Sequence, residues 1–224
     1  MEAVAENIWI LQRPLRVLGI DVRRTTTVIR LRDRRLIIHS SAPFTRNDVD
    51  DIRALGEPAW LVDATAAHDT CAASARAIFP DVPYLVPEKF SNRRELRAEV
   101  LGALPSAWRG EIEMLMIAGM PRIQEHVFLH VPSGTLIVAD LLVSITPAYP
   151  AWMQWFARAV MRWDDGVGMD PLFRWMIDDR VAFRRSIEEI LGWDFRRVIV
   201  GHAGVIDRDA KERFAEVMAR VRGR

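Results

Sequence analysis

Histidine and aspartate residues that follow apolar, strand-like runs are the side chains of this chain best suited to chemistry. His39 ends one such run, His68 follows another by a few residues, and His202 closes the last one in VIVGHAG. Asp140 ends the run TLIVAD in the same way. In open α/β sheets, ligand sites gather at the carboxyl ends of the strands. We therefore expect these side chains to meet along one edge of a sheet.

A divalent metal ion is the ligand that this combination favours. Imidazole nitrogen and carboxylate oxygen are donors that suit zinc, iron or manganese. Each residue alone has a plainer interpretation, because a histidine at a strand end more often only forms hydrogen bonds, and Asp140 could cap the segment that follows it. The sequence leaves both interpretations open, and it is the joint pattern that favours the metal.

Other catalytic classes find little support. Cys71 is the only cysteine, which excludes an internal disulfide and a multi-cysteine zinc site, and its alanine neighbours predict a small buried side chain rather than a nucleophile. No serine lies in a G-x-S-x-G turn, so triad chemistry is not expected. Gly19 and Gly102 are isolated, so no dinucleotide-binding loop is expected, and an oxidoreductase using dioxygen or a flavin is the least favoured class.

Composition bounds the cellular setting. A formal net charge of +1 gives no basic face for nucleic acid. No run of 18 apolar residues is present, so we expect no membrane span, and the first 14 residues do not resemble a secretory signal. We expect a cytoplasmic protein whose partner is a small-molecule ligand of unknown identity.

The elements that must position these residues follow from the periodicity of apolar side chains. β-Branched runs predict an antiparallel meander first, then strand–helix–strand alternation predicts parallel pairing, and a second strand group with a tight turn at Pro132–Gly134 leads into helices. The expected strands are 8–11, 25–31, 36–39, 59–62, 83–86, 111–117, 126–131, 135–139 and 197–200, and the expected helices are 46–55, 69–79, 149–163, 171–191 and 207–221. Each half runs from strands to helices. We predict one α/β domain over residues 1–224, folded as a four-layer αββα sandwich.

The helical block is rich in tryptophan. A cluster of this kind can bind a hydrophobic ligand or a membrane surface, but packing between helices and sheet is the more common arrangement. Interleaved arginines also predict guanidinium stacking on indole rings. We expect a packed core formed by Trp152, Trp155, Trp163, Trp175 and Trp193.

The segment NIWILQRPLRVLGIDVRRTTTVIRLRDRRLIIHSSAP, residues 7–43, resembles the start of a bacterial family, domain of unknown function 4336, which is related to the metallo-β-lactamase fold. The similarity continues through HVFLHVPSGTLIVADLL and WDFRRVIVGHAGVIDRD, so it covers nearly the whole chain. The resemblance implies the same four-layer sandwich. It implies no particular reaction.

The wider superfamily binds metals through an HxHxDH loop, which corresponds to ATAAHD, residues 64–69. Alanine replaces its first two histidines, while His68 and Asp69 occupy its last two positions with their types exchanged. The segment GMPRIQEH offers no ligand at the next expected position, where Glu125 or His126 would need a local shift. Asp140 corresponds to the bridging aspartate and His202 to the last histidine. The metal ligands implied by the resemblance are thus His68, Asp69, Asp140 and His202.

Two functions follow from this reduced ligand set. In the first, the chain is a metal-dependent hydrolase with one zinc, iron or manganese ion, in which Asp140 binds the ion or orients the water that attacks an ester, amide or phosphoester bond. In the second, it is a non-catalytic binding or scaffold domain that has lost its metal, and His68 and Asp69 are an ordinary hydrogen-bonded pair.

Overall fold

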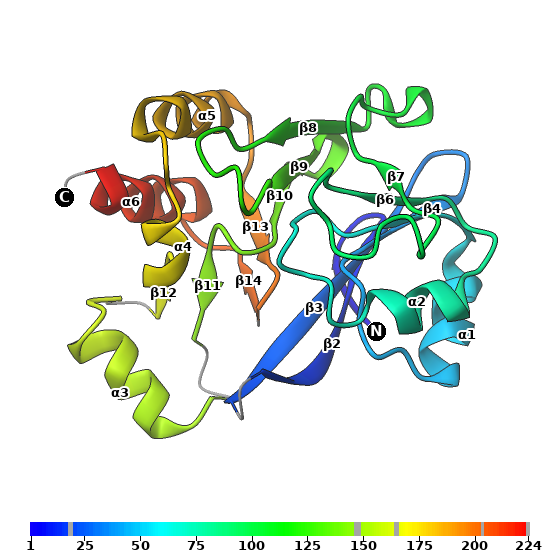
Figure 1. The fold of residues 1–224 in the computed structure, drawn as a ribbon, viewed down its shortest axis with the longest axis horizontal. Helices are drawn as coiled ribbons and strands as arrows, with labels where there is room; N and C mark the ends of the chain where they lie inside the picture. The colour runs from blue at the N-terminus through cyan, green and yellow to red at the C-terminus, as the bar shows by residue number, and fades with distance from the viewer. Residues whose placement is uncertain (18–19, 146–148, 164–165, 203, 223–224) are drawn as a thin grey trace.

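In the computed structural model, two β-sheets face each other and helices cover both outer sides (Figure 1). The structure describes residues 1–17, 20–145, 149–163, 166–202 and 204–222. In Figure 1 the helices α1 and α2 lie at one end of this arrangement and α5 and α6 at the other. The four layers of the predicted αββα sandwich are therefore present.

The first sheet has seven strands in chain order, antiparallel from β1 to β4 and parallel from β4 to β7. The predicted meander is confirmed, although its first two expected strands are longer than their apolar runs and are preceded by β1. The strands are β1 (Glu2–Ala5), β2 (Ile8–Val17), β3 (Ile20–Arg30), β4 (Arg35–His39), β5 (Glu57–Val62), β6 (Tyr84–Val86) and β7 (Glu99–Val100).

Two helices carry the parallel crossovers of this sheet. Helix α1 (Arg46–Leu55) begins with a capping box, in which Thr45 and Asp48 each accept a hydrogen bond from the other's backbone N–H. Helix α2 (Ala72–Ile78) is shorter than the predicted 69–79, because residues 70 and 71 form a turn. A short 3₁₀ turn, η1 (Ser106–Trp108), leads out of the sheet.

The second sheet has five strands in the order β14-β13-β10-β9-β8. Strands β10 and β13 are parallel neighbours, and the long connection between them carries α3, α4 and α5. Gly134 closes the turn before β10 with a left-handed φ of 59°, which glycine adopts without steric cost. The elements are β8 (Ile112–Met116), β9 (His126–His130), η2 (Val131–Ser133), β10 (Thr135–Val138), α3 (Ala151–Ala159), α4 (Pro171–Trp175), α5 (Arg180–Gly192), β13 (Arg197–Val200), β14 (Gly204–Ile206) and α6 (Ala210–Arg222), with β11 (Val143–Ser144) and β12 (Val167–Gly168) as a separate pair.

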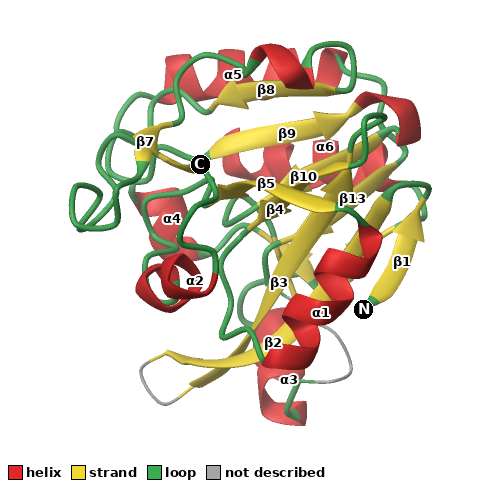
Figure 2. Cartoon of the chain, turned by 90° about the vertical axis from the view of Figure 1, so that its right-hand side faces the viewer, coloured by secondary structure: helices red, strands yellow, loops and turns green. Residues whose placement is uncertain are grey.

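Alternation along the strands divides the apolar residues among three cores. On β4, Leu36 and Ile38 pack with α1 and α2, whereas Ile37 faces the other sheet. On β10, Leu136 and Val138 pack with α5 and α6, whereas Ile137 points between the sheets. Successive side chains of a strand point to opposite faces, so each sheet is buried on both sides. In Figure 2, β8, β9 and β10 of the second sheet lie above β2 and β3 of the first, and α5 lies above β8.

The helical block departs from its prediction in two ways. The expected helix 171–191 is broken before α5, where Asp179 caps the new helix by accepting from two backbone N–H groups. The expected tryptophan core is wrong for Trp152, Trp155 and Trp175, whose exposed fractions are 60%, 66% and 70%, although Trp163 is buried. Among the described residues, the arginine that stacks on a tryptophan of this cluster is Arg122, over Trp175, and it comes from outside the helical block. No helix in the described ranges is long and apolar enough to cross a membrane.

Candidate metal centre

Three of the predicted residues meet at one edge of the facing sheets. His68 follows β5 by a short loop, Asp140 lies two residues after β10, and His202 lies two residues after β13. Nε2 of His68 and Nε2 of His202 each lie 3.1 Å from Oδ1 of Asp140. The ligand atoms of the three residues all lie within 4.8 Å of one another.

Close backbone packing brings His202 to this position. A Cβ atom on Gly201 would lie 2.5 Å from the carbonyl oxygen of Ala139, so only glycine lets the loops after β13 and β10 touch. The backbone N–H of Thr25 on β3 donates to the Gly201 carbonyl at 2.8 Å, and Nδ1 of His202 lies 3.1 Å from the Arg23 carbonyl oxygen. The loop is therefore fixed from both sheets.

The bond from His202 to a carbonyl decides which nitrogen carries its proton. A carbonyl oxygen only accepts, so Nδ1 of His202 must be the donor. In the neutral ring Nε2 then has a lone pair, and that lone pair faces Oδ1 of Asp140. This contact is favourable only if His202 carries a second proton or if a cation lies between the two atoms. Metal-binding histidines commonly hold their second nitrogen to a backbone carbonyl in this manner.

Asp140 also presents an oxygen with no partner. Among the described residues, no group forms a hydrogen bond with its buried Oδ2. Burial alone would raise the pKa of Asp140, but the adjacent His68 and His202 hold that pKa well below its ordinary value, so the carboxylate is ionised. A buried, ionised oxygen without a partner is costly unless a cation or donor reaches it. The donor set therefore fits a divalent ion.

The distances also fit a small coordination shell. Tetrahedral bonds of about 2.1 Å place neighbouring ligand atoms about 3.4 Å apart, close to the 3.1 Å separations of the two imidazoles from Asp140. Two histidines and one carboxylate are a ligand set used by catalytic zinc and by non-haem iron, and they leave coordination positions open.

A second layer of polar residues lies behind His68. Oγ of Ser40 is 3.5 Å from Nδ1 of His68 and 3.3 Å from Nδ1 of His39. Burial lowers the pKa of His68, with Arg24 adding to the effect, and burial lowers the pKa of His39 to about 3. A lowered pKa favours the neutral ring, which is the form of His68 that could bind a metal ion. Ser40 itself has a left-handed φ of 71°, a strained conformation that is common beside functional sites.

The structure places the remaining candidates elsewhere. Asp69 is exposed and is not part of the group formed by the other three predicted ligands. Glu125 instead accepts the backbone N–H groups of Ala139 at 2.8 Å and Asp140 at 3.0 Å, and burial raises its pKa to about 8. Nδ1 of His126 lies 3.0 Å from the Gln124 carbonyl. Glu125 therefore positions Asp140. Sequence reasoning missed this role, because an acidic residue just before a strand does not indicate it.

Alanine at the motif positions has a packing reason. Ala64, which corresponds to the superfamily's first histidine, is fully buried in the core between the sheets. Its carbonyl accepts the backbone N–H of His126 at 2.7 Å, which ties the loop to β9. The loop after β5 is thus held by packing and backbone bonds.

A cavity of about 430 Å³ lies beside the three residues. Arg24 of β3 lines this cavity together with His68, Asp140 and His202. No sequence pattern had indicated Arg24 as a site residue. The rest of the wall is mostly apolar and comes from β11, from α3 and its flanks, and from α4. Its apolar and aromatic residues are Val143, Ile145, Tyr149, Trp152, Met153, Phe156, Ala157, Met161, Trp163 and Phe173.

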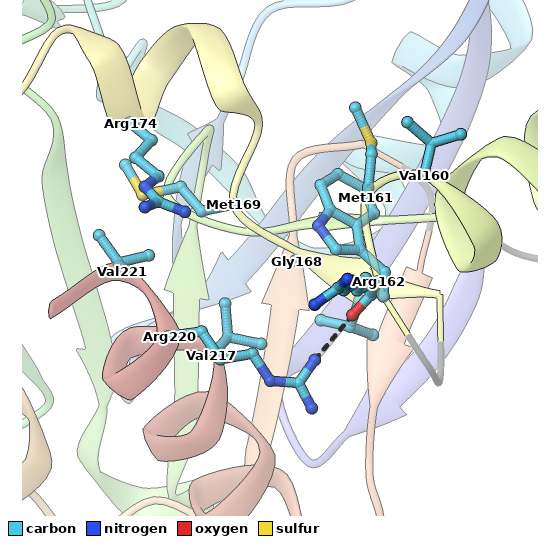
Figure 3. Close-up of a pocket in the computed structure, with 11 residues that line it drawn as sticks. Val160, Met161, Arg162, Gly168, Met169, Arg174, Val217, Arg220 and Val221 are labelled. Carbon is cyan, nitrogen blue, oxygen red and sulfur yellow. Dashed lines mark hydrogen bonds between the residues drawn. The ribbon is translucent and has the colours of Figure 1, made fainter. Parts of the chain in front are cut away.

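Another hollow is lined by none of His68, Asp140 and His202. Figure 3 shows this hollow, of about 710 Å³, between the end of α3, α4 and α6. Arg162, Arg174 and Arg220 reach it, and Nη1 of Arg220 donates to the Arg162 carbonyl. None of its described lining residues is a histidine or a carboxylate, so it has no metal-binding character. The smaller cavity is the one next to the reactive groups.

A second aspartate, Asp63, is also buried just after a strand. Asp63 follows β5 directly and accepts the backbone N–H of Ser41 at 2.8 Å, together with short hydrogen bonds from the hydroxyl groups of Ser41 and Tyr84. Both of its oxygens are therefore occupied by donors of the protein.

Comparison with known proteins gives one family and one fold. The sequence model described as "Domain of unknown function (DUF4336)" matches residues 5–173. No curated protein matches the chain.

Solved structures align over almost the whole chain. The metallo-β-lactamase DIM-1 is 18% identical with a TM-score of 0.65, covering 98% of this chain and 96% of that one. The metallo-β-lactamase FIM-1 from Pseudomonas aeruginosa, in its mono-zinc form, is 11% identical with a TM-score of 0.59, covering 100% and 96%. The Flv1 flavodiiron core from Synechocystis sp. PCC6803 is 8% identical with a TM-score of 0.64, covering 97% and 59%. These similarities confirm the metallo-β-lactamase fold.

Proposed function

The chain belongs to the DUF4336 family and has the metallo-β-lactamase fold. We propose that it is a metal-dependent hydrolase with a single-ion site. His68, Asp140 and His202 hold the ion through Nε2, Oδ1 and Nε2. The observation that carries the proposal is the approach of His202 Nε2 to Oδ1 of Asp140 at 3.1 Å, while Nδ1 of the same ring lies 3.1 Å from the Arg23 carbonyl oxygen.

The protein's own groups divide the work around the ion. A zinc, iron or manganese ion, when bound, supplies the Lewis acidity that brings the pKa of a water molecule near neutrality. Oδ2 of Asp140 accepts a hydrogen bond from the attacking water and orients it. Glu125 holds the backbone of Asp140, and Gly201 and Arg23 hold His202. The apolar wall of the cavity excludes bulk water from the bond that is cleaved.

The comparisons support one ion rather than two. The FIM-1 structure is described as a mono-zinc form, so this fold accommodates a single ion in that protein. In the present chain, Ala64 and Ala66 replace two donors, and Asp69 lies outside the group of three. The scissile bond is an ester, amide or phosphoester.

Elemental analysis of the purified protein tests the proposal. We expect about one zinc, iron or manganese ion per chain, lost in His202→Ala and in Asp140→Asn, and retained in His126→Gln, whose histidine lies outside the group. The same preparations are tested against aryl esters, anilides and phosphoesters. A protein that is free of metal and refuses added metal, or a His202→Ala variant that keeps its ion, contradicts the proposal and leaves the non-catalytic binding domain.

A further inference from the structure

Arg24 is a buried cation that forms no salt bridge with any residue the structure describes. Its exposed fraction is 2%, and its Nε and Nη1 atoms have no hydrogen-bond partner among the residues that the structure describes. None of the salt bridges in that part of the chain involves Arg24. Burying these two nitrogens costs free energy, because they have lost their hydrogen bonds to water and have no replacement among the described residues. Packing alone therefore gives no reason for an arginine here.

Arg24 lies between the residues that fix the metal centre. Its neighbours on β3 are Arg23, whose carbonyl receives His202, and Thr25, whose N–H holds the Gly201 carbonyl. The Arg24 side chain lines the same cavity as His68 and Asp140. An anion that paired with Arg24 would thus lie beside the proposed ion.

The opposite wall of the cavity is apolar and continues to the surface. Trp152, Met153 and Phe156 of α3 line it, and Trp152 and Phe156 are 60% and 40% exposed. The Tyr149 hydroxyl, just before α3, accepts the backbone N–H of Arg23 at 3.3 Å, so this helix is tied to β3 beside Arg24. An apolar chain can therefore run from the cavity along α3.

The hollow in Figure 3 does not offer the same combination. Arg162 and Arg220 are exposed there, so water solvates their charges, and the Arg220 guanidinium already binds a carbonyl. Arg24 alone of these arginines is dehydrated and unpaired at Nε and Nη1.

We propose that the cavity takes a small amphiphilic anion, whose carboxylate or phosphate pairs with the Arg24 guanidinium and whose apolar chain lies against α3. The planar guanidinium forms paired hydrogen bonds with either anion. The inference deepens the proposed function by naming its substrate class, and it rests on that function only for the cleavage step. Binding itself requires no ion.

Calorimetric titration with three probes of equal chain length tests this inference. Octanoate and octyl phosphate carry the two candidate anions, and octan-1-ol is the neutral control. With a chelator present, we expect one or both anions to bind wild type at least about tenfold more tightly than octan-1-ol, since hydrogen bonds to a charged group are worth this much. The tighter of the two identifies the anion.

Substitution of Arg24 assigns the preference to its charge. Arg24→Met should bring the ratio of anion to alcohol affinity to about one and leave the melting temperature unchanged or higher, because an unpaired buried charge is removed. Arg24→Lys keeps part of the preference, and Arg162→Met, the control in the other hollow, keeps all of it. Equal binding of octan-1-ol, no binding of either anion, or an unchanged ratio in Arg24→Met overturns the inference. If Arg24→Met does not fold, Arg24→Lys takes its place. A lower ratio of anion to alcohol affinity in Arg24→Lys than in Arg162→Met then supports the inference, and equal ratios in these two variants overturn it.

The two proposals fail separately. If the wild-type protein binds a metal ion but does not prefer the anions to octan-1-ol, only the inference about Arg24 is rejected. Anion preference in a protein that binds no metal rejects the hydrolase and leaves a ligand-binding domain.

Discussion

Asp63 and Asp140 are both buried aspartates just beyond the carboxyl end of a strand, yet their surroundings are opposite. Asp63, after β5, receives three hydrogen bonds from Ser41 and Tyr84. Asp140, after β10, shares one oxygen between two imidazoles and leaves the other without a partner among the described residues.

The difference separates a structural carboxylate from a reactive one. Protein donors neutralise the cost of burying Asp63, so that residue holds the loops after β4 and β5 together. The surroundings of Asp140 are incomplete without an external cation or donor, so binding energy remains available for a ligand. Both aspartates are buried just beyond a strand. They differ in whether donors of the protein form hydrogen bonds with both carboxylate oxygens.

The largest expected effect is on stability at Asp63. Asp63→Ala leaves the Ser41 and Tyr84 donors buried and unpaired, so it should lower the free energy of unfolding by about 3–5 kcal/mol. With a chelator present, Asp140→Asn should lower the free energy of unfolding by less than about 1 kcal/mol. Without the chelator, the same variant should bind no metal. Urea unfolding with both variants measures the difference. Equal losses of unfolding free energy at the two positions would contradict the distinction between Asp63 and Asp140.

Part of the acid sensitivity should arise away from the metal centre, at the turn after β9, in addition to the contribution of the buried His39 and His68. Burial lowers the pKa of His130 to about 4 from 6.5, and its Nδ1 lies 2.8 Å from Oγ of Ser133. The folded state therefore favours the neutral ring. Its contribution is complete above pH 6.5 and is lost as the pH falls towards 4, by up to about 3 kcal/mol at about 1.4 kcal/mol per pKa unit. Unfolding in urea between pH 7 and 4 should show a shallower slope for His130→Gln than for wild type. Identical slopes would refute this assignment.

The contact between the two loops at the centre should be sensitive to one methyl group. Gly201→Ala places a Cβ 2.5 Å from the Ala139 carbonyl, so it should cost about 1–3 kcal/mol and weaken metal binding by about 10- to 100-fold by moving His202. Gly102→Ala is the matched control, because a Cβ there meets nothing within 4 Å. Metal titration and thermal melts of both variants test the prediction, which fails if they behave alike.

The smallest expected effect is at Asp69. This residue is exposed and outside the group of three, so Asp69→Ala should change the free energy of unfolding by no more than about 0.5 kcal/mol and leave the metal content unchanged. Loss of the ion in this variant would show that the loop after β5 closes over the centre when metal binds, and would sharpen the ligand set to four.

Local patterns explain which parts of the fold were predictable. The alternation on β4 and β10 and the Thr45 cap of α1 are set by neighbours in sequence, so strands, helices and their layers follow from the chain alone. The break before α5 was missed because the apolar spacing continues through it, and the exposure of Trp152 was missed because it depends on what the rest of the chain covers.

The candidate site shows the same division. His68, Asp140 and His202 could be found because a polar residue after a buried strand is a local signal at a place where ligands collect. Asp69, a ligand implied only by the resemblance, lies outside the group, whereas Glu125 and Arg24 contribute without a strand-end signal. An arginine within the run VRRTTTV reads as an exposed strand residue until another loop covers it.

Apolar periodicity and the residues that end strands and helices act between near neighbours, so the elements, their layers and the polar residues at the strand ends follow from the sequence. Which of those residues meet, which carboxylate has hydrogen-bond donors and which arginine loses its water depend on how the two sheets pack. The contact that orients His202 joins it to Arg23, 179 positions earlier in the chain. Hydrogen bonding and desolvation depend on such distant partners, and these are fixed only when the two sheets pack together.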